Sequence, residues 1–302
     1  MVPRIALSKQ GPDVSRIVHG LWRLAEWKKS KRQILELIHG CLEQGITTFD
    51  HADIYGDYTC EGRFGSVLAG SGIGRAAIQL VTKCGIKLVS ANRPNHVIKS
   101  YDTSYSHIVA SVENSLRCLH TDYIDLLLIH RPDPLMDPQE VNRAFVSLKQ
   151  SGKVRYFGVS NFLPCQFEML ASKLEVPLVT NQIEYSVMNL DAHADGSIDL
   201  CQKVQICPMA WSPLGGGRLF REDSDRAHRV RETLTMIDRD VGGASIDQVA
   251  IAWVLKHPAG FAPVLGTGNL PRIKKAVEAL DIVLSSEQWF EIRCASLGRE
   301  VA

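Results

Sequence analysis

Ser30-Lys-Arg-Gln-Ile-Leu-Glu-Leu-Ile-His-Gly-Cys-Leu-Glu-Gln-Gly45-Ile-Thr-Thr-Phe-Asp50 contains one complete helix-to-strand unit. Ser30 and Gln33 match a capping box, which predicts where the helix begins. Apolar side chains then recur at helical spacing. Gly45 predicts the end of the helix, because glycine readily takes the left-handed conformation found there. The residues from Thr47 to Asp50 follow as a strand candidate, so this stretch predicts a helix that leads directly into a strand.

Apolar strand candidates and amphipathic helices alternate along the rest of the chain. The other strand candidates are residues 16–20, 78–83, 124–129, 154–160, 180–182, 205–211 and 262–265. One helix carries an apolar stripe that consists of Ile108, Val112, Leu116 and Leu119. Asp137, Ser245 and Asn269 are capping candidates for three later helices. The glycine clusters at 215–217 and 242–243 predict a long loop between them.

Apolar strands that are separated by helices are typical of a parallel sheet covered by those helices. About eight such units are the number that closes a barrel. We therefore expect an α/β fold with residues 1–302 in a single-domain (β/α)8 TIM barrel. A doubly wound sheet is the alternative, but the chain has no Gly-x-Gly-x-x-Gly after its first strand, so a Rossmann site is not supported.

Composition excludes several classes of partner. The chain has 34 Lys and Arg against 33 Asp and Glu, so it lacks the basic field that nucleic-acid binding requires. No stretch approaches the roughly 20 apolar residues of a membrane span, and the amino terminus has no apolar stretch long enough for a signal sequence, so we expect neither. Eight scattered cysteines without a Cys-x-x-Cys pair indicate reduced thiols and no zinc site. We therefore expect a cytoplasmic protein.

Polar residues follow the second, third and fourth predicted strands, whose carboxyl ends share the barrel mouth. They are Asp50 with Tyr55 just beyond it, then Lys83, then His130. A phenol with a pKa of about 10 is a weak acid, but a nearby ammonium group lowers that pKa. Asp50 would hold Lys83 charged, and His130 would bind a carbonyl oxygen or share in proton delivery. These residues predict proton donation from Tyr55 to a carbonyl oxygen.

Several stretches that contain these residues resemble the aldo-keto reductase superfamily. They are Gly45-Ile-Thr-Thr-Phe-Asp50-His-Ala-Asp-Ile-Tyr55-Gly56, Thr82-Lys83-Cys84, Asp122-Tyr-Ile-Asp-Leu-Leu-Leu-Ile-His130-Arg-Pro-Asp133 and Gly152-Lys-Val-Arg-Tyr-Phe-Gly-Val-Ser160-Asn161-Phe162. The similarity runs in order over almost the whole chain. The tail around Gln288-Trp289-Phe290 is most similar to the bacterial YdhF-like oxidoreductases. The resemblance implies carbonyl reduction with a catalytic tetrad of Asp50, Tyr55, Lys83 and His130.

The resemblance also implies a nicotinamide cofactor and the residues that hold it. Ser160, Asn161 and Gln182 would bind the carboxamide, and Trp211 would stack on the nicotinamide ring. Backbone N–H groups of the segment with Ser212, Leu214 and Gly216 would approach the pyrophosphate.

The far end of the cofactor would lie near Gly266, Thr267 and Arg272. Arg272 suits a 2′-phosphate, which favours NADPH. The family's usual Lys is missing at 266, and its Glu-Asn pair is missing at 275–276. NADH therefore stays open as an alternative.

Weaker signals concern the substrate. Trp22 and Trp27 follow the first strand, where walls of a substrate pocket form, and core packing is nearly as well supported for both. The segment 85–103 is either a substrate loop or a surface excursion. His51 alternates with Asp50 and should face away from the barrel interior. No second histidine accompanies it, so a metal site is not expected.

The leading hypothesis is an NADPH-dependent carbonyl reductase that acts on a small molecule. A nicotinamide-binding sensor or auxiliary subunit with little turnover is the alternative, and a metal-assisted barrel hydrolase or lyase ranks third. We expect a monomer or a weak oligomer. The sequence identifies neither the physiological substrate nor the direction of the reaction.

Overall fold

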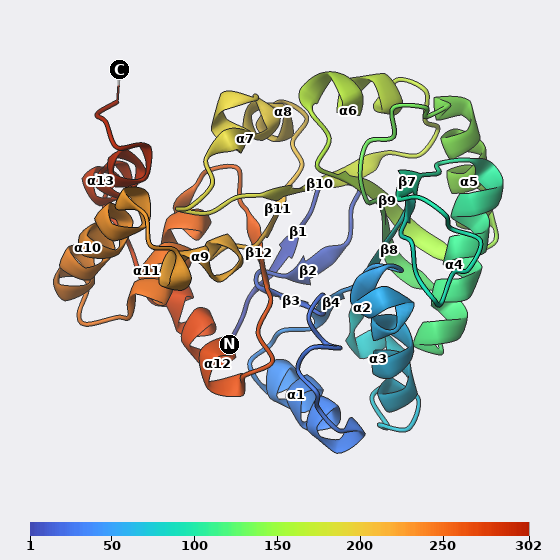
Figure 1. Ribbon diagram of the computed structural model, residues 1–302, viewed down its shortest axis with the longest axis horizontal. Coiled ribbons are helices and arrows are strands. Elements are labelled where there is room, and N and C mark those ends of the chain that lie inside the picture. The colour runs from blue at the N-terminus through green and yellow to red at the C-terminus, as the bar shows by residue number, and fades with distance from the viewer. Residues whose placement is uncertain (302) are drawn as a thin grey trace.

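Eight parallel strands close into a barrel in the computed structural model, which describes residues 1–301 (Figure 1). In the order in which they pair, these strands are β3 (Val18–Gly20), β4 (Thr48–Asp50), β5 (Gln79–Cys84), β8 (Ile124–Ile129), β9 (Val154–Ser160), β10 (Leu178–Glu184), β11 (Met209–Trp211) and β12 (Ala262–Leu265). The (β/α)8 prediction is confirmed. Every barrel strand lies within a predicted strand or overlaps one, and β8, β9 and β12 match their predicted bounds.

Helices surround this barrel (Figure 1). They are α1 (Lys31–Glu43), α2 (Tyr55–Tyr58), α3 (Cys60–Leu68), α4 (Tyr105–Leu119), α5 (Pro138–Gln150), α6 (Pro164–Ala171), α7 (Asp191–Ala194), α8 (Ser197–Lys203), α9 (Arg218–Arg221), α10 (Asp225–Asp240), α11 (Ile246–Lys256), α12 (Leu270–Glu278) and α13 (Ser286–Leu297). Short 3-10 turns occupy η1 (Arg75–Ala77), η2 (Gly215–Gly217) and η3 (Ala279–Asp281). The capping box predicted at Ser30 is present, and at the predicted cap residue Ser245 the side chain of Gln248 accepts the N–H of Ser245 over 2.8 Å. Within residues 1–301, no helix combines the length and apolarity that crossing a membrane requires.

The prediction of a loop between residues 215 and 243 is wrong, because most of that segment is helical. α10 begins at the cap residue Ser224 and buries four apolar side chains at helical spacing. They are Ala227, Val230, Leu234 and Ile237. Charged residues fill the rest of α10, and they obscure this narrow stripe in the sequence. The two glycine clusters flank this helical segment, and the residues between them are mostly ordered as helix.

Two hairpins lie outside the barrel sheet. β1 (Arg4–Ala6) pairs with β2 (Asp13–Ser15), and β6 (Ile86–Lys87) pairs with β7 (Ser100–Tyr101). Leu7 and Val14, from the first hairpin, are buried in one cluster with side chains of the barrel interior. Ser15 exchanges hydrogen bonds with Thr48 at the amino end of β4. The first hairpin therefore closes the amino end of the barrel, and the carboxyl end stays accessible.

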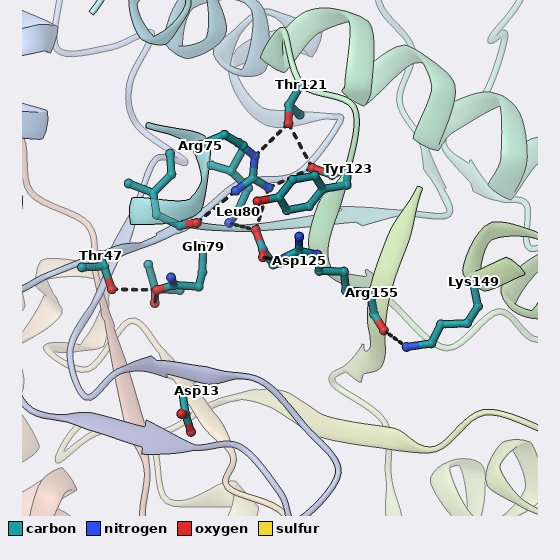
Figure 2. A network of polar contacts seen from close by, with 12 residues as sticks. Asp13, Thr47, Arg75, Gln79, Leu80, Thr121, Tyr123, Asp125, Lys149 and Arg155 are labelled. Carbon is teal, nitrogen blue, oxygen red and sulfur yellow. Dashed lines mark hydrogen bonds and ion pairs between the residues drawn. The ribbon is translucent and has the colours of Figure 1, made fainter. Parts of the chain in front are cut away.

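A polar network joins the amino ends of β5, β8 and β9 (Figure 2). Arg75 donates to Asp125 Oδ2 over 2.6 Å, and Asp125 also accepts the N–H of Leu80 over 2.9 Å. The ring of Tyr123 lies between two guanidinium groups, 3.9 Å from Arg75 and 3.7 Å from Arg155. Only 8% of the Asp125 side chain is exposed, so this carboxylate depends on its hydrogen-bond donors.

Replacing Asp125 should therefore destabilise the barrel. The Asp125→Ala variant leaves the Arg75 guanidinium without its charge partner, and we expect it to lower the free energy of unfolding by about 2–4 kcal/mol. Glu168→Ala is the matched control, because the Glu168–Lys203 pair is largely exposed and should contribute little. Urea denaturation followed by circular dichroism measures both. Equal losses in the two variants would contradict a structural role for the network.

Candidate active site

The structure brings together the four residues predicted at the strand ends. Asp50 ends β4, Lys83 lies in β5, and His130 directly follows β8. Tyr55 begins α2, five residues after Asp50. Because parallel strands present their carboxyl ends at one mouth, residues far apart in the chain meet there.

Lys83 is the centre of this group. Its Nζ donates to Asp50 Oδ1 and Oδ2 over 2.8 and 2.7 Å, to the backbone oxygen of His51 over 2.7 Å, and to Tyr55 Oη over 3.0 Å. Only 1% of the Lys83 side chain and 3% of the Asp50 side chain are exposed. Gln182 adds a donor to Asp50 Oδ1 over 2.8 Å. The pair is thus removed from water and fully hydrogen-bonded.

The surroundings set the protonation state of each group. Burial disfavours the ammonium of Lys83, but Asp50 and Tyr55 together raise its pKa above the ordinary value. Burial also raises the pKa of Tyr55, and the opposing charge of Lys83 reduces that effect. Lys83 thus lowers the pKa of the phenol, as expected, but burial outweighs this effect and the net shift is upward. Burial, Lys83 and Arg131 lower the pKa of His130 well below its usual range.

These pKa shifts assign one form to each side chain near neutral pH. Lys83 is charged, Tyr55 keeps its phenolic proton, and His130 is a neutral imidazole. The rings of Tyr55 and His130 lie 5.8 Å apart at 77°. Nδ1 of His130 is buried and has no hydrogen-bond partner among the described residues. The phenol of Tyr55 is therefore protonated where it lines the cavity.

A left-handed turn directly after Tyr55 fixes its direction. Gly56, Asp57 and Tyr58 have φ angles of 56°, 56° and 64°. A Cβ at Gly56 would lie 2.5 Å from Sγ of Cys60, so only glycine fits there. The β6–β7 segment fastens the turn, because Asn92 donates to the oxygen of Asp57 over 2.8 Å.

A row of hydrogen-bonded side chains continues from this centre to β11. Ser160 Oγ donates to the backbone oxygen of Gln182 over 2.8 Å, and Asn161 Nδ2 donates to Ser160 Oγ over 2.7 Å. Trp211 Nε1 donates to Asn161 Oδ1 over 2.9 Å. The four residues predicted for the nicotinamide thus form one connected row, in which Gln182 also contacts Asp50.

Beyond Trp211 the chain makes an unusual turn. Ser212 has a φ of 51°, and Gly215, Gly216 and Gly217 all have positive φ. Both Arg23 and Arg221 donate to the backbone oxygen of Gly216, over 3.0 and 2.9 Å. Sequence reasoning missed these two arginines, because nothing in their spacing links them to the glycine run.

The residues predicted for the adenosine end lie around the start of α12. A Cβ built at Gly266 meets no atom within 4 Å, so the backbone is open there. The side chain of the cap residue Asn269 accepts the N–H of Arg272 over 3.1 Å, and the Arg272 side chain is exposed. Trp27 packs against Gly268, where a Cβ would lie 2.6 Å from its ring, so it borders this loop.

One cavity of about 1550 Å³ joins all these regions. It is lined by Trp22, Trp27, Asp50, Tyr55, His130, Ser160, Asn161, Gln182, Trp211, Ser212, Leu214, Gly216, Gly266, Thr267 and Arg272, among others. Of the predicted site residues, only Lys83 lies behind its wall. Trp22 is 52% exposed at the mouth, which argues against core packing for this residue. Lys99, Tyr101 and Arg131 also line the cavity, and sequence reasoning assigned them no role.

His51 lies outside the barrel interior, as predicted. Its ring contacts Phe64 of α3 with 4.6 Å between ring centroids, and none of its surface is exposed. Within residues 1–301, no group of three or more His, Cys, Asp or Glu side chains is arranged to hold a metal ion.

Comparison with known proteins gives consistent results. The sequence profile of the Aldo/keto reductase family matches residues 16–296. The uncharacterized oxidoreductase YcsN of Bacillus subtilis is 55% identical over 95% of this chain and 96% of its own. The oxidoreductase YdhF of Escherichia coli is 48% identical over the full length of both chains. A 6-dehydroglucose reductase of Agrobacterium fabrum is 46% identical over 99% of each chain.

Among solved structures, the thermostable aldo-keto reductase Tm1743, crystallised with the inhibitor epalrestat, superimposes with a TM-score of 0.83. It shares 26% of its sequence with this chain and covers 97% of it. The barrel, the family profile and the full-length relatives lead to one conclusion: the chain belongs to the aldo/keto reductase family of oxidoreductases.

Proposed function

We propose that this protein reduces aldehyde or ketone groups to alcohols with NADPH, and that Tyr55 is the proton donor. One carbonyl group, one NADPH and one proton would give one alcohol and one NADP⁺. The observation that supports this most strongly is the continuous contact of Asp50, Lys83 and Tyr55 beside His130 at the cavity wall. In this arrangement, a carbonyl oxygen that enters the cavity would meet a protonated phenol backed by a buried ammonium.

The chain's own residues divide the proton chemistry among them. Tyr55 would donate its proton to the carbonyl oxygen as negative charge develops there. Lys83 would stabilise the phenolate that remains, and Asp50 would keep Lys83 charged and in place. His130, as a neutral imidazole, would donate a hydrogen bond to the same oxygen but has no acidic proton near neutral pH.

The cavity fits a dinucleotide cofactor, which when bound supplies the hydride that adds to the carbonyl carbon. Ser160, Asn161 and Gln182 offer amide and hydroxyl groups for a carboxamide, and Trp211 offers a flat ring. Gly216 leaves room for a close approach, because a Cβ there would have no contact shorter than 3.5 Å. The segment with Ser212 and Leu214 would hold the pyrophosphate through backbone N–H groups.

NADPH is proposed over NADH because of Arg272. Its exposed guanidinium lines the far end of the cavity near Gly266 and Thr267, and no described residue forms an ion pair with it. A planar guanidinium binds a phosphate through two hydrogen bonds, so it would favour the cofactor that carries a 2′-phosphate.

The names of the relatives suggest one candidate substrate but do not identify the substrate of this protein. The relative from Agrobacterium fabrum is named a 6-dehydroglucose reductase, so 6-dehydroglucose belongs in the first panel of carbonyl substrates. A sensor with little turnover would bind NADPH and reduce no member of such a panel.

Removing the phenol tests the proton donor. Tyr55→Phe should lower kcat for carbonyl reduction by about 10²–10⁴-fold, the usual contribution of a general acid. NADPH binding, measured by fluorescence titration, should stay close to that of the wild type. Tyr123→Phe, at the amino end of the barrel, is the matched control and should retain full activity. Turnover by Tyr55→Phe at the wild-type rate would exclude Tyr55 as the donor.

Removing the guanidinium tests the choice of cofactor. Arg272→Gln should weaken NADPH binding by about tenfold and leave the Kd of NADH nearly unchanged, because only NADPH has the extra phosphate. Lys274→Gln, on the same helix, is exposed and does not line the cavity, so it serves as the control. If both cofactors lost the same affinity in Arg272→Gln, the proposed phosphate contact would be wrong.

A further inference from the structure

Part of the cavity wall has no role in the mechanism proposed above. It consists of Trp22, Ile86, Lys99, Tyr101 and Arg131. Ile86, Lys99 and Tyr101 come from the β6–β7 segment, and Arg131 directly follows His130. Arg131 follows His130 in the chain, and its charge acts on both His130 and Tyr55, so a substrate whose carbonyl reaches Tyr55 would lie beside this part of the wall.

Arg131 is the most unusual residue of this wall. Its side chain is partly buried, yet within residues 1–301 its guanidinium makes no hydrogen bond or ion pair. Its nearest aromatic contact is the ring of Trp211, 5.8 Å away, which is near the limit for an attractive interaction. Together with burial and Lys83, its charge lowers the pKa of His130, so it acts close to the tetrad. A partly buried guanidinium whose five N–H donors have no protein partner can donate hydrogen bonds to an anionic ligand.

Lys99 adds a second cation to the same wall. The other cations of its segment are engaged, since Lys87 lies 3.7 Å from Asp102 and Arg93 lies over the ring of Tyr58. Lys99 is exposed and has no hydrogen bond or ion pair within residues 1–301. The segment itself is anchored, because the N–H of Leu88 donates to Tyr58 Oη over 2.8 Å.

Among the described residues, no carboxylate forms an ion pair with Arg131 or Lys99. The acidic residues that line the cavity are Glu26, Glu36, Asp50 and Asp247, and none comes from the β6–β7 segment or from the end of β8. Asp50 is already paired with Lys83. The wall beside the tetrad therefore has a net positive charge that faces the substrate.

We propose that the preferred substrates are carbonyl compounds that also carry a carboxylate, which Arg131 and Lys99 bind while the carbonyl oxygen contacts Tyr55. This inference rests on the proposed reductase function. The planar guanidinium of Arg131 would bind both carboxylate oxygens, and Lys99 would add a weaker, more solvated attraction. Arg131 is thus a specificity-determining residue of the same site.

Matched pairs of substrates isolate this effect. We would measure kcat/KM for 4-oxobutanoate and 5-oxopentanoate, each against its neutral methyl ester. For the better-fitting chain length, the wild type should prefer the acid by about tenfold or more. Arg131→Gln should reduce this acid-to-ester ratio by about tenfold, and Lys99→Gln by about threefold.

Two further variants serve as controls. Arg131→Lys keeps the charge without the planar fork, so its ratio should lie between those of the wild type and Arg131→Gln. Lys87→Gln removes a cation of the same segment that does not line the cavity, and it should leave the ratio unchanged. Because each ratio compares two substrates on one enzyme, a general loss of activity cancels.

The outcomes separate the two proposals. If the wild type reduces acids and esters equally well, or if Arg131→Gln keeps the wild-type ratio, the carboxylate inference is overturned and the reductase function stands. If the wild type reduces neither the acids nor the esters nor any other carbonyl compound, the reductase function itself is wrong.

Discussion

The ion pair between Lys83 and Asp50 lies almost entirely out of water, and this sets the conditions for everything around it. A buried charge is costly unless each of its polar atoms has a partner. Lys83 meets this requirement through both carboxylate oxygens, a backbone oxygen and Tyr55. Gln182 reaches Asp50 from β10, which lies opposite β4 in the order of the eight strands. One polar contact thus crosses the barrel, and the phenol oxygen of Tyr55 is the fourth acceptor atom around the ammonium.

The two ends of the barrel differ in structure: the amino end is closed, and the carboxyl end is open to a cavity. At the amino end, the β1–β2 hairpin covers the interior, and the network around Arg75 and Asp125 joins three strands (Figure 2). At the carboxyl end, the loops after the strands leave one long cavity open. Rigid strands therefore position Asp50, Lys83 and His130, while the longer loops are free to differ in charge and shape. The unpaired Arg131 and Lys99 are examples of such loop chemistry.

Much of this arrangement can be predicted from the sequence, and the exceptions have physical reasons. Ile124–Ile129 is predictable because a strand that is buried on both faces must be apolar throughout. The tetrad is predictable because Asp50, Lys83 and His130 are polar residues at the ends of apolar strands. The pKa of Tyr55 cannot be predicted from the sequence. It depends on how deeply the phenol is buried relative to the Lys83 ammonium, and the sequence pattern does not contain that information. The sequence of α10 has apolar residues at helical spacing, but they are few among many charged residues, so the helix is hard to recognise from the sequence. Arg131 stands beside His130 in the sequence, yet its lack of a partner is visible only in three dimensions.

The central claim is that Lys83 makes the phenol of Tyr55 easier to ionise than burial alone would allow. Titration of ¹³C-labelled tyrosine rings by NMR, in the wild type and in Lys83→Met, tests it directly. Removing the ammonium should raise the pKa of Tyr55 further above its already raised value, because the phenolate would lose the cation that donates a hydrogen bond to it. The Lys83→Met variant must first show native NADPH binding, so that the comparison concerns a folded protein. An unchanged or lower pKa of Tyr55 in that variant would contradict the account.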